Sequence, residues 1–354
     1  METKEAINWL KKKNLLETAR KNSSSLKNIF SECLAAKKEN ILVIGDIGYK
    51  ERHVSPVLSA AYYLAAEKQG LNCKLILQNP KRRGELVDDI VASNLEAAEK
   101  GSIIVLNLSN KLGKMNGLGK SFRSMCKKNR HRFISTPSLG CLTTDKINKI
   151  TRAIDIDYKS LKKRHDRLKE IIGKGKEITV ATKKGTKLYL DIKNIKPEAA
   201  DGCYNKEGTG GNLPAGEVYL APNKIEGTAV IDASSRNMYS TQLLRRDIKI
   251  IIENSKVTDI IDGNPARLLR KSLEWAKGRA KYPERVNTAC ELGIGLNPKA
   301  EIVGSTIIDE KVLNTAHIGI GSNYWFGGKV KTIIHLDQVF RSPKIYVDGE
   351  VLRV

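Results

Sequence analysis

The side chains best suited to chemistry lie near the C-terminus, where His335 and Asp337 flank Leu336 in the segment TIIHLDQV. In a β-strand, residues i and i+2 lie on one face, so these two side chains would project together. An imidazole and a carboxylate held side by side on a rigid strand suit a divalent metal ion. A simple histidine–aspartate hydrogen bond would use the same spacing, so the neighbouring segments must decide between the two.

Two neighbouring segments share a pattern that favours a binding site. HIGIG begins at His317 and ELGIG begins at Glu291. As strands, both would place one polar donor and two glycines on one face, with isoleucine or leucine on the other. Glycine weakens a strand and often marks the close approach of a ligand or of another backbone. The two segments are therefore expected to line a cleft, although two glycine-rich edge strands would show the same letters.

A further carboxylate, Glu217, follows a Gly/Pro turn and opens the expected strand VYL. Its position would hold the side chain rigidly, but such a residue, taken alone, is more often a solvated glutamate.

The N-terminal half has the alternating pattern of a parallel α/β sheet. A long helical stretch over 3–38 comes first, and a second one over 144–173 closes this half. Between them we expect strands over 41–46, 73–77, 103–108 and 133–135, with helices over 57–69 and 86–100. The turn after the first strand reads GDIG rather than GxGxxG, so no dinucleotide site is predicted.

The C-terminal half has short strands with glycine-rich turns, a hairpin over 178–191 and a helix over 265–281. We therefore predict an α/β plus α+β protein: an N-terminal parallel α/β sheet domain over 1–175 and a strand-rich metal-binding domain over 176–354.

Composition limits the function classes. The 354 residues carry a net charge of +23, of which residues 1–177 contribute 36 − 19 = +17. Such a charge could bind nucleic acid or steer acidic substrates, but no nucleic-acid-binding motif accompanies it, so nucleic acid is not the expected partner. No apolar run approaches the roughly 20 residues of a membrane span, and the N-terminus lacks a signal-peptide pattern. A cytoplasmic enzyme without a membrane partner is the expectation.

Five segments in order resemble the aminopeptidase T family of metallo-exopeptidases. They are NLPAGEVYLAP, ELGIGLNP, DEKVLNTAHIGIG, NYWFGG and HLD. The resemblance covers about residues 200–340 clearly. It implies a homodimer and two divalent ions, zinc, cobalt, manganese or magnesium. It assigns metal ligation to Glu217, Glu291, Glu310, His317, His335 and Asp337.

The resemblance also implies a reaction, the hydrolysis of the N-terminal peptide bond of a short peptide, or of an amino-acid amide, by a metal-activated water. Glu291 or Glu310 would be the general base, and Tyr324 would stabilise the oxyanion. Glu310 lies seven residues before His317, a wider spacing than the family leads us to expect.

The same fold resembles that of dihydroxypyridine dioxygenase, which implies an alternative with one ferrous ion. His317, His335 and Asp337 would then form a facial triad in a ring-cleaving enzyme. The surplus of carboxylates favours hard metal ions and the peptidase over this alternative. A third reading is a basic binding protein with a vestigial site.

Overall fold

The computed structural model describes residues 1–115 and 121–354. The chain forms two compact units. The first comprises Met1–Tyr158 and Gly202–Ala215, and the second comprises Lys159–Asp201 and Gly216–Val354. The predicted division between residues 175 and 176 falls inside the second unit, and it stays a prediction about folding domains.

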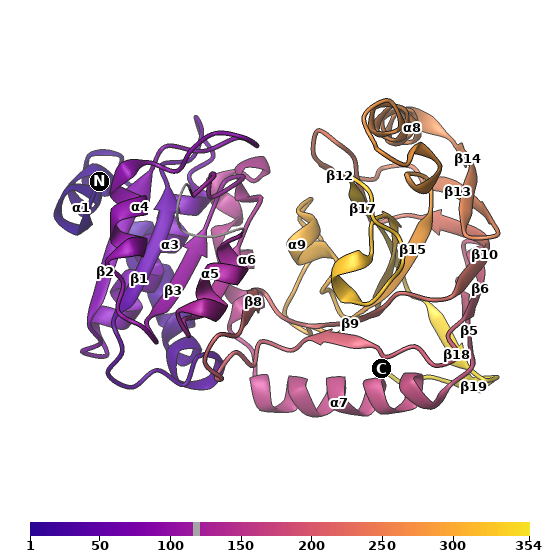
Figure 1. Cartoon of the computed structure of the whole chain (residues 1–354), viewed down its shortest axis with the longest axis horizontal. Coiled ribbons are helices and arrows are strands. Elements are labelled where there is room, and N and C mark those ends of the chain that lie inside the picture. The colour runs from indigo at the N-terminus through magenta and orange to yellow at the C-terminus, as the bar shows by residue number, and fades with distance from the viewer. Residues whose placement is uncertain (116–120) are drawn as a thin grey trace. The chain divides into compact units, whose positions relative to one another are not determined.

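The first unit is built on a parallel sheet (Figure 1). Its strands run in the spatial order β2, β1, β3, β4 and β8 in the described residues, and each neighbouring pair is parallel. The four predicted strands are confirmed to within a residue, and the sequence did not reveal β8. The bounds are β1 (Ile41–Asp46), β2 (Cys73–Gln78), β3 (Ile103–Asn107), β4 (Arg132–Thr136) and β8 (Gly210–Asn212).

Helices cover this sheet, and α3 packs against β1, β2 and β3. The helical stretches predicted over 3–38 and 144–173 are each divided into several helices. The first is interrupted near Asn14, whose φ of 56° is left-handed, and the second is interrupted at Asp155, whose ψ of 75° is not helical. The helices here are α1 (Thr3–Lys12), α2 (Leu16–Ser23), α3 (Val54–Glu67), α4 (Asp89–Glu96), α5 (Phe122–Lys128) and α6 (Ile147–Ile154), and α7 (Tyr158–Lys174) follows.

The second unit contains two antiparallel sheets, as the strand-rich prediction requires. The first sheet includes the predicted hairpin, whose strands β5 and β6 pair from Glu177 with Asp191 to Ala181 with Lys187. Its order is β14 (Lys256–Ile261), β13 (Ile248–Glu253), β10 (Lys224–Ile231), β6 (Lys187–Asp191), β5 (Glu177–Ala181), β18 (Lys344–Val347) and β19 (Glu350–Val351). The predicted helix over 265–281 corresponds to α8 (Gly263–Lys277).

The other sheet carries all the strands on which the sequence places metal-binding side chains. Its order is β12 (Thr241–Leu243), β11 (Ser234–Arg236), β17 (His335–Arg341), β16 (Thr315–Gly321), β15 (Ala289–Gly295), β9 (Glu217–Leu220) and β7 (Glu198–Ala200). The short helix α9 (Thr306–Asp309) lies between β15 and β16 in the sequence. The mixed α/β architecture predicted from the sequence is thus confirmed.

Candidate metal centre

Four adjacent strands each present polar side chains to one region of the sheet. Glu217 comes from β9, Glu291 from β15 and His317 from β16, while β17 supplies both His335 and Asp337. All are buried except His335, which is partly buried. The alternate residues of β15, β16 and β17 are buried and, apart from Gln338, apolar. Strand alternation therefore places the donors on one face of the sheet and these side chains on the other.

The glycines on the donor face make room for the donor side chains themselves, where the sequence predicted a cleft with open space beside the donors. Gly293 pairs with His317 across β15 and β16, and a Cβ atom there would lie 2.0 Å from the His317 Cε1 atom. A Cβ atom at Gly319 would lie 2.8 Å from both Glu291 Cβ and His335 Cε1. Since carbon atoms in contact lie about 3.5–4.0 Å apart, any other residue at either position would displace a donor.

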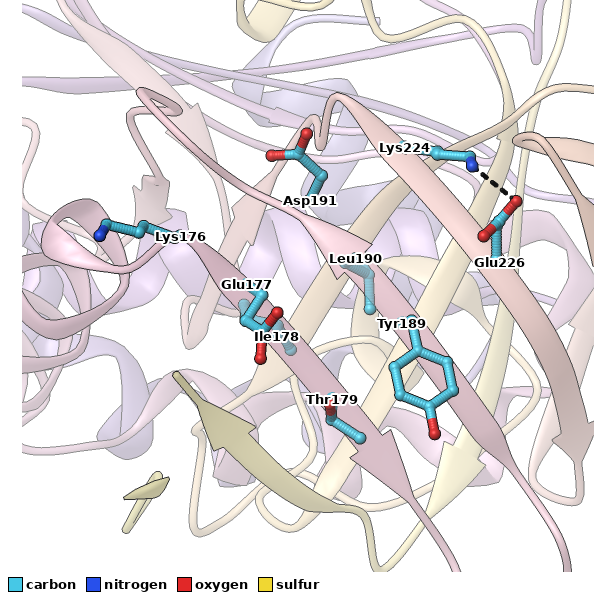
Figure 2. Close-up of a pocket in the computed structure, with 9 residues that line it drawn as sticks. All are labelled: Lys176, Glu177, Ile178, Thr179, Tyr189, Leu190, Asp191, Lys224 and Glu226. Atoms are coloured by element: carbon cyan, nitrogen blue, oxygen red, sulfur yellow. Dashed lines mark ion pairs between the residues drawn. The ribbon is translucent and has the colours of Figure 1, made fainter. Parts of the chain in front are cut away.

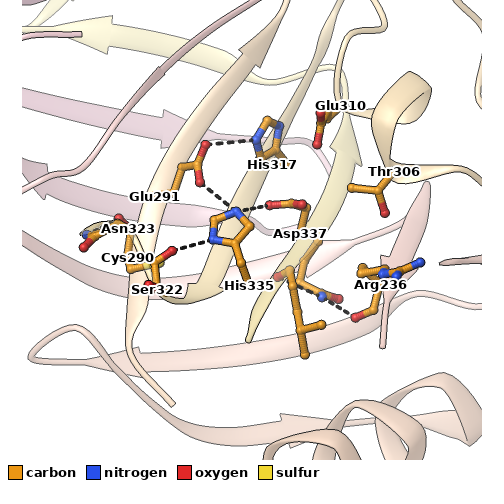
Figure 3. Close-up of polar contacts among 12 residues, drawn as sticks. Arg236, Cys290, Glu291, Thr306, Glu310, His317, Ser322, Asn323, His335 and Asp337 are labelled. Atoms are coloured by element: carbon orange, nitrogen blue, oxygen red, sulfur yellow. Dashed lines mark hydrogen bonds and ion pairs between the residues drawn. The ribbon is translucent and has the colours of Figure 1, made fainter. Parts of the chain in front are cut away.

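His335 lies at the centre of the first group of donors (Figure 3). Its Nε2 atom is 2.9 Å from Glu291 Oε2 and 2.8 Å from Asp337 Oδ1. Neither of these two carboxylate oxygens has a hydrogen-bond partner within the described residues. Ligands around one first-row metal ion with bonds of about 2.1 Å also lie roughly 3 Å apart. The three donors therefore converge as metal ligands do.

The other ring nitrogen of His335 is fixed by the backbone. Nδ1 lies 2.7 Å from the carbonyl oxygen of Ser322, to which its N–H donates. In a neutral ring this leaves the Nε2 lone pair directed at Glu291 and Asp337 (Figure 3). Metal-binding histidines are commonly oriented in this way. The ring of Trp325, 4.9 Å away at 70°, packs against the imidazole and further restricts its rotation.

A second group comprises Glu217, Glu310 and His317, each of which offers a ligand atom within 4.8 Å of the others. His317 Nε2 lies 3.8 Å from Glu217 Oε2 and 3.6 Å from Glu291 Oε1. Because the other oxygen of Glu291 reaches His335, both imidazole Nε2 atoms face one carboxylate, as Figure 3 shows. The two groups are thus adjacent.

Lys311 lies within this second group and completes what we call the polar cluster: Glu217, Glu291, Glu310, Lys311, His317, His335 and Asp337. Its Nζ atom donates to Glu217 Oε1 and, at 2.5 Å, to Glu310 Oε1. The side chain is buried. An ammonium group placed there neutralises part of the carboxylate charge without a metal ion.

The carboxylates keep the histidines protonated when no metal is bound. Burial opposes the charged form of His317, yet Glu291 and Asp337 outweigh it and raise its pKa to about 9. Burial likewise opposes the charged form of His335, but Asp337 and Glu291 hold its pKa well above the usual range. Burial alone would raise the pKa of Asp337, but His335 keeps it well below its ordinary value. A cation would find strong negative potential here.

Buried polar atoms without hydrogen-bond partners support a bound ion at this place. Within the part of the chain that the structure describes, these atoms include Glu217 Oε2, Glu291 Oε2, His317 Nδ1 and Asp337 Oδ1. Leaving such groups unpaired costs about 1–3 kcal/mol each, and more for a charged group. Three of these atoms are carboxylate oxygens at the cluster, so the donor set fits a divalent metal ion.

Tyr324 is the one predicted site residue that the structure does not bring into the polar cluster. Its side chain is 61% exposed, and Lys331 Nζ lies 5.2 Å from the centre of its ring. The following residues, Trp325 and Phe326, are the ones whose rings contact His335, at 4.9 and 6.2 Å.

A cleft of about 540 Å³ shares this aromatic wall. Tyr219, Trp325 and Phe326 line it, and Tyr219 and Phe326 contact each other edge-to-face at 5.2 Å. Tyr219 is two residues from Glu217 on β9, so both project from the same face of the sheet. The cleft therefore lies beside the polar cluster.

A second depression, of about 260 Å³, lies over β5, β6 and β10 (Figure 2). It shares no lining residue with the polar cluster. Its charged side chains include the ion pair of Lys224 with Glu226 at 2.7 Å, which is largely exposed. We assign it no role in the reaction.

Comparisons with known proteins define the class to which this fold and site belong. The solved structure of 2,5-dihydroxypyridine dioxygenase from Pseudomonas putida matches with a TM-score of 0.68 and 17% identity, over 95% of this chain and 98% of that one. Wild-type AmpT from Thermus thermophilus matches with a TM-score of 0.61 and 14% identity, over 94% and 97%. At these identities the likeness shows a common fold, so the relation to aminopeptidase T holds at that level.

The family is shown by the sequence. The family model described as "NicX: 2,5-dihydroxypyridine 5,6-dioxygenase" matches residues 141–353, and the chain belongs to this family. The curated 2,5-dihydroxypyridine 5,6-dioxygenase of Pseudomonas putida is 24% identical over 193 residues, which are 51% of this chain and 54% of that protein. The chain thus aligns with about half the length of this relative.

These findings correct the function expected first from the sequence. The interpretation as a hydrolase, and specifically as an aminopeptidase or metalloprotease, is wrong because the family model and the curated relative both name a dioxygenase. The alternative with one ferrous ion agrees better with them.

Among residues 1–115 and 121–354, no helix is long and apolar enough to cross a lipid bilayer.

Proposed function

We propose that this protein is a ring-cleaving dioxygenase that depends on a single ferrous ion. Membership of the dioxygenase family supports the reaction class. The observation that carries the proposal is the position of Glu291, whose two oxygens lie 3.6 Å from His317 Nε2 and 2.9 Å from His335 Nε2. Both imidazoles therefore face one small volume beside Asp337.

His317, His335 and Asp337 would hold the ion. Two histidines and one carboxylate with open positions are typical of non-heme iron oxygenases. Bound there, ferrous iron would supply the redox chemistry that couples dioxygen to opening of the ring. The Ser322 carbonyl and the Trp325 ring would keep His335 in its binding orientation.

Glu291 would act on the proton of the substrate. It is buried between the two imidazoles, with its oxygens 3.6 Å from His317 Nε2 and 2.9 Å from His335 Nε2, so the charge of an ion held by those histidines would favour its ionised form. A carboxylate that stays ionised in a buried site can accept the proton of a ring hydroxyl group. In this proposal Glu291 is a proton acceptor, and the iron is held mainly by the other three residues.

The substrate class follows from the cleft and from the names of the relatives. Tyr219, Trp325 and Phe326 provide aromatic walls that suit a planar ring, since edge-to-face and offset-stacked contacts each contribute about 0.5–1.5 kcal/mol. We propose a dihydroxylated pyridine or a closely related hydroxylated ring as the substrate. Its hydroxyl groups would be directed at the polar cluster.

The test is oxygen uptake by protein loaded anaerobically with Fe²⁺ and given 2,5-dihydroxypyridine. The proposal expects dioxygen consumption, loss of the ring absorbance, and a product that carries two atoms of ¹⁸O from ¹⁸O₂. His335→Ala should abolish all three. An iron-loaded, folded protein that consumes no dioxygen with any of a panel of hydroxylated pyridines and catechols would refute the proposal.

A further inference from the structure

The most unusual group of the polar cluster is Lys311, a lysine only 1% exposed. It follows α9 directly, and its Nζ atom pairs with Glu217 and, at 2.5 Å, with Glu310. Lysine is almost never fully buried unless it is paired. Here two carboxylates from different parts of the chain share one ammonium group.

The surroundings keep Lys311 charged. Burial alone would lower its pKa, but Glu217 and Glu310 raise it well above the usual range. Removing one partner of a buried pair leaves an uncompensated charge, which costs about 3–5 kcal/mol. The contacts of its Nζ atom with both glutamates and its burial hold the ammonium group in place within this cluster.

The place that Lys311 occupies is also a possible metal site. Glu217, Glu310 and His317 offer ligand atoms within 4.8 Å of one another, which is enough for an ion. Yet Lys311 donates to Oε1 of both glutamates. An ion bound by those oxygens would have to displace the ammonium group, which is only 1% exposed and would lose both of its carboxylate partners.

We propose that the ammonium group of Lys311 takes the place of a second divalent ion and limits the centre to one. This inference rests on the metal centre of the proposed function, and it does not depend on which ring is cleaved. Lys311 thereby becomes a specificity-determining residue: it leaves His317, His335 and Asp337, with Glu291 beside them, as the place for the single ion.

The charge balance agrees with one ion. With neutral histidines and all four carboxylates ionised, the polar cluster has a net charge of −3, and one divalent ion brings this to −1. Burial raises the pKa of Glu310 to about 8, and with Glu310 protonated the two sums are −2 and 0. Two divalent ions beside Lys311 would give the buried cluster a net charge of +1. Two divalent ions without Lys311 would give it a net charge of −4 + 4 = 0. Buried net charge is costly, so removal of Lys311 should favour a second ion.

The consequence for chemistry is direct. Two ions about 3.5–4 Å apart are the arrangement that clamps both oxygens in hydrolytic reactions. With Lys311 in place, a centre of this kind cannot form, although the carboxylates that could support it are present. Lys311 thus favours the one-ion chemistry of the proposed function.

The experiment counts Mn²⁺ ions bound per chain, by mass spectrometry after equilibration and desalting and by electron paramagnetic resonance. It compares the wild-type chain, Lys311→Met, and the matched control Lys344→Met, an exposed lysine of β18 on the other sheet. We expect one ion in the wild type and the control, and two spin-coupled ions in Lys311→Met. Two ions in the wild type, or the same number in wild type and folded Lys311→Met, would overturn the inference.

A second variant covers the case in which Lys311→Met does not fold. Glu310→Gln keeps the pairing of Lys311 with Glu217 and should retain one Mn²⁺ ion with affinity within about threefold of wild type. Loss of an ion from Glu310→Gln would show that Glu310 is a metal ligand and refute the inference. Oxygen uptake is read separately: its absence in protein with the expected ion counts would refute the ring-cleavage proposal alone.

Discussion

The glycine opposite His317 offers the sharpest test of how the sheet positions the metal ligands. In Gly293→Ala, the new methyl group would lie 2.0 Å from His317 Cε1 and 2.3 Å from Nε2. Relief of this contact requires a shift of about 1.5 Å or more, since carbon atoms pack at about 3.5–4.0 Å. Ligand positions tolerate only about 0.5 Å. His317 should therefore leave its binding position.

The expected loss follows from this displacement. Misplacing a metal ligand typically costs 10–100-fold in affinity, or roughly 1.4–2.8 kcal/mol. Overpacking adds a stability cost of about 1–3 kcal/mol to the metal-free protein. Competition with a chromophoric chelator measures the Fe²⁺ or Mn²⁺ affinity, and thermal unfolding with and without metal separates the two costs.

The matched control is Gly173→Ala near the end of α7. A Cβ atom there meets Pro197 Cδ at 3.6 Å, an ordinary contact. This variant should keep the wild-type metal affinity and gain a few tenths of a kcal/mol to about 1 kcal/mol in stability. If Gly293→Ala also kept wild-type metal affinity, His317 would not be a ligand, and the argument from the glycines would fail.

Four further predictions concern neighbouring groups. Glu291→Gln should keep the iron but lower kcat by about 10²–10⁴-fold, as loss of a proton acceptor does, measured by iron content and oxygen uptake. Trp325→Ala should raise KM for the ring without changing iron content, whereas Tyr324→Phe, at an exposed position, should change neither by more than about twofold. Because a metal ion must displace protons from His317, whose pKa is about 9, and from His335, whose pKa is held well above its usual range, metal affinity should rise with pH from pH 6 to at least pH 9, as a chelator titration from pH 6 to 10 would show. The homodimer implied by the resemblance to aminopeptidase T remains a prediction, and light scattering should then give twice the chain mass.

Much of the site could be predicted because it depends on strand alternation. His335 and Asp337 share a face at spacing i, i+2, and the GIG segments after His317 and Glu291 predict donors beside open space. The pairing of Gly293 with His317 then brings these segments together through ordinary antiparallel register. The parallel sheet of the first unit could be predicted equally well from the sequence, because its strands are largely apolar runs. Residues 41–46, for example, are buried throughout.

The remainder depends on contacts that no local pattern encodes. Lys311 follows α9 in a short irregular segment, and only the fold shows that it pairs with Glu217, 94 residues earlier. The available signal was weak: a lysine directly after Asp309 and Glu310 and before the apolar Val312 and Leu313. Counting carboxylates without this ammonium group favoured two hard ions, and with them the hydrolase. The Ser322 carbonyl that orients His335 belongs to the backbone, so the type of residue at position 322 does not indicate this contact.

The measurement that most directly tests the central claim is an anaerobic titration with Fe²⁺, followed by oxygen uptake at each iron level with 2,5-dihydroxypyridine present. The account predicts that activity rises linearly and levels off at one iron per chain, with one dioxygen consumed for each ring opened. Asp337→Asn should bind no iron and consume no dioxygen. Activity that requires two ions per chain, or iron-saturated protein that leaves dioxygen untouched, would contradict the account.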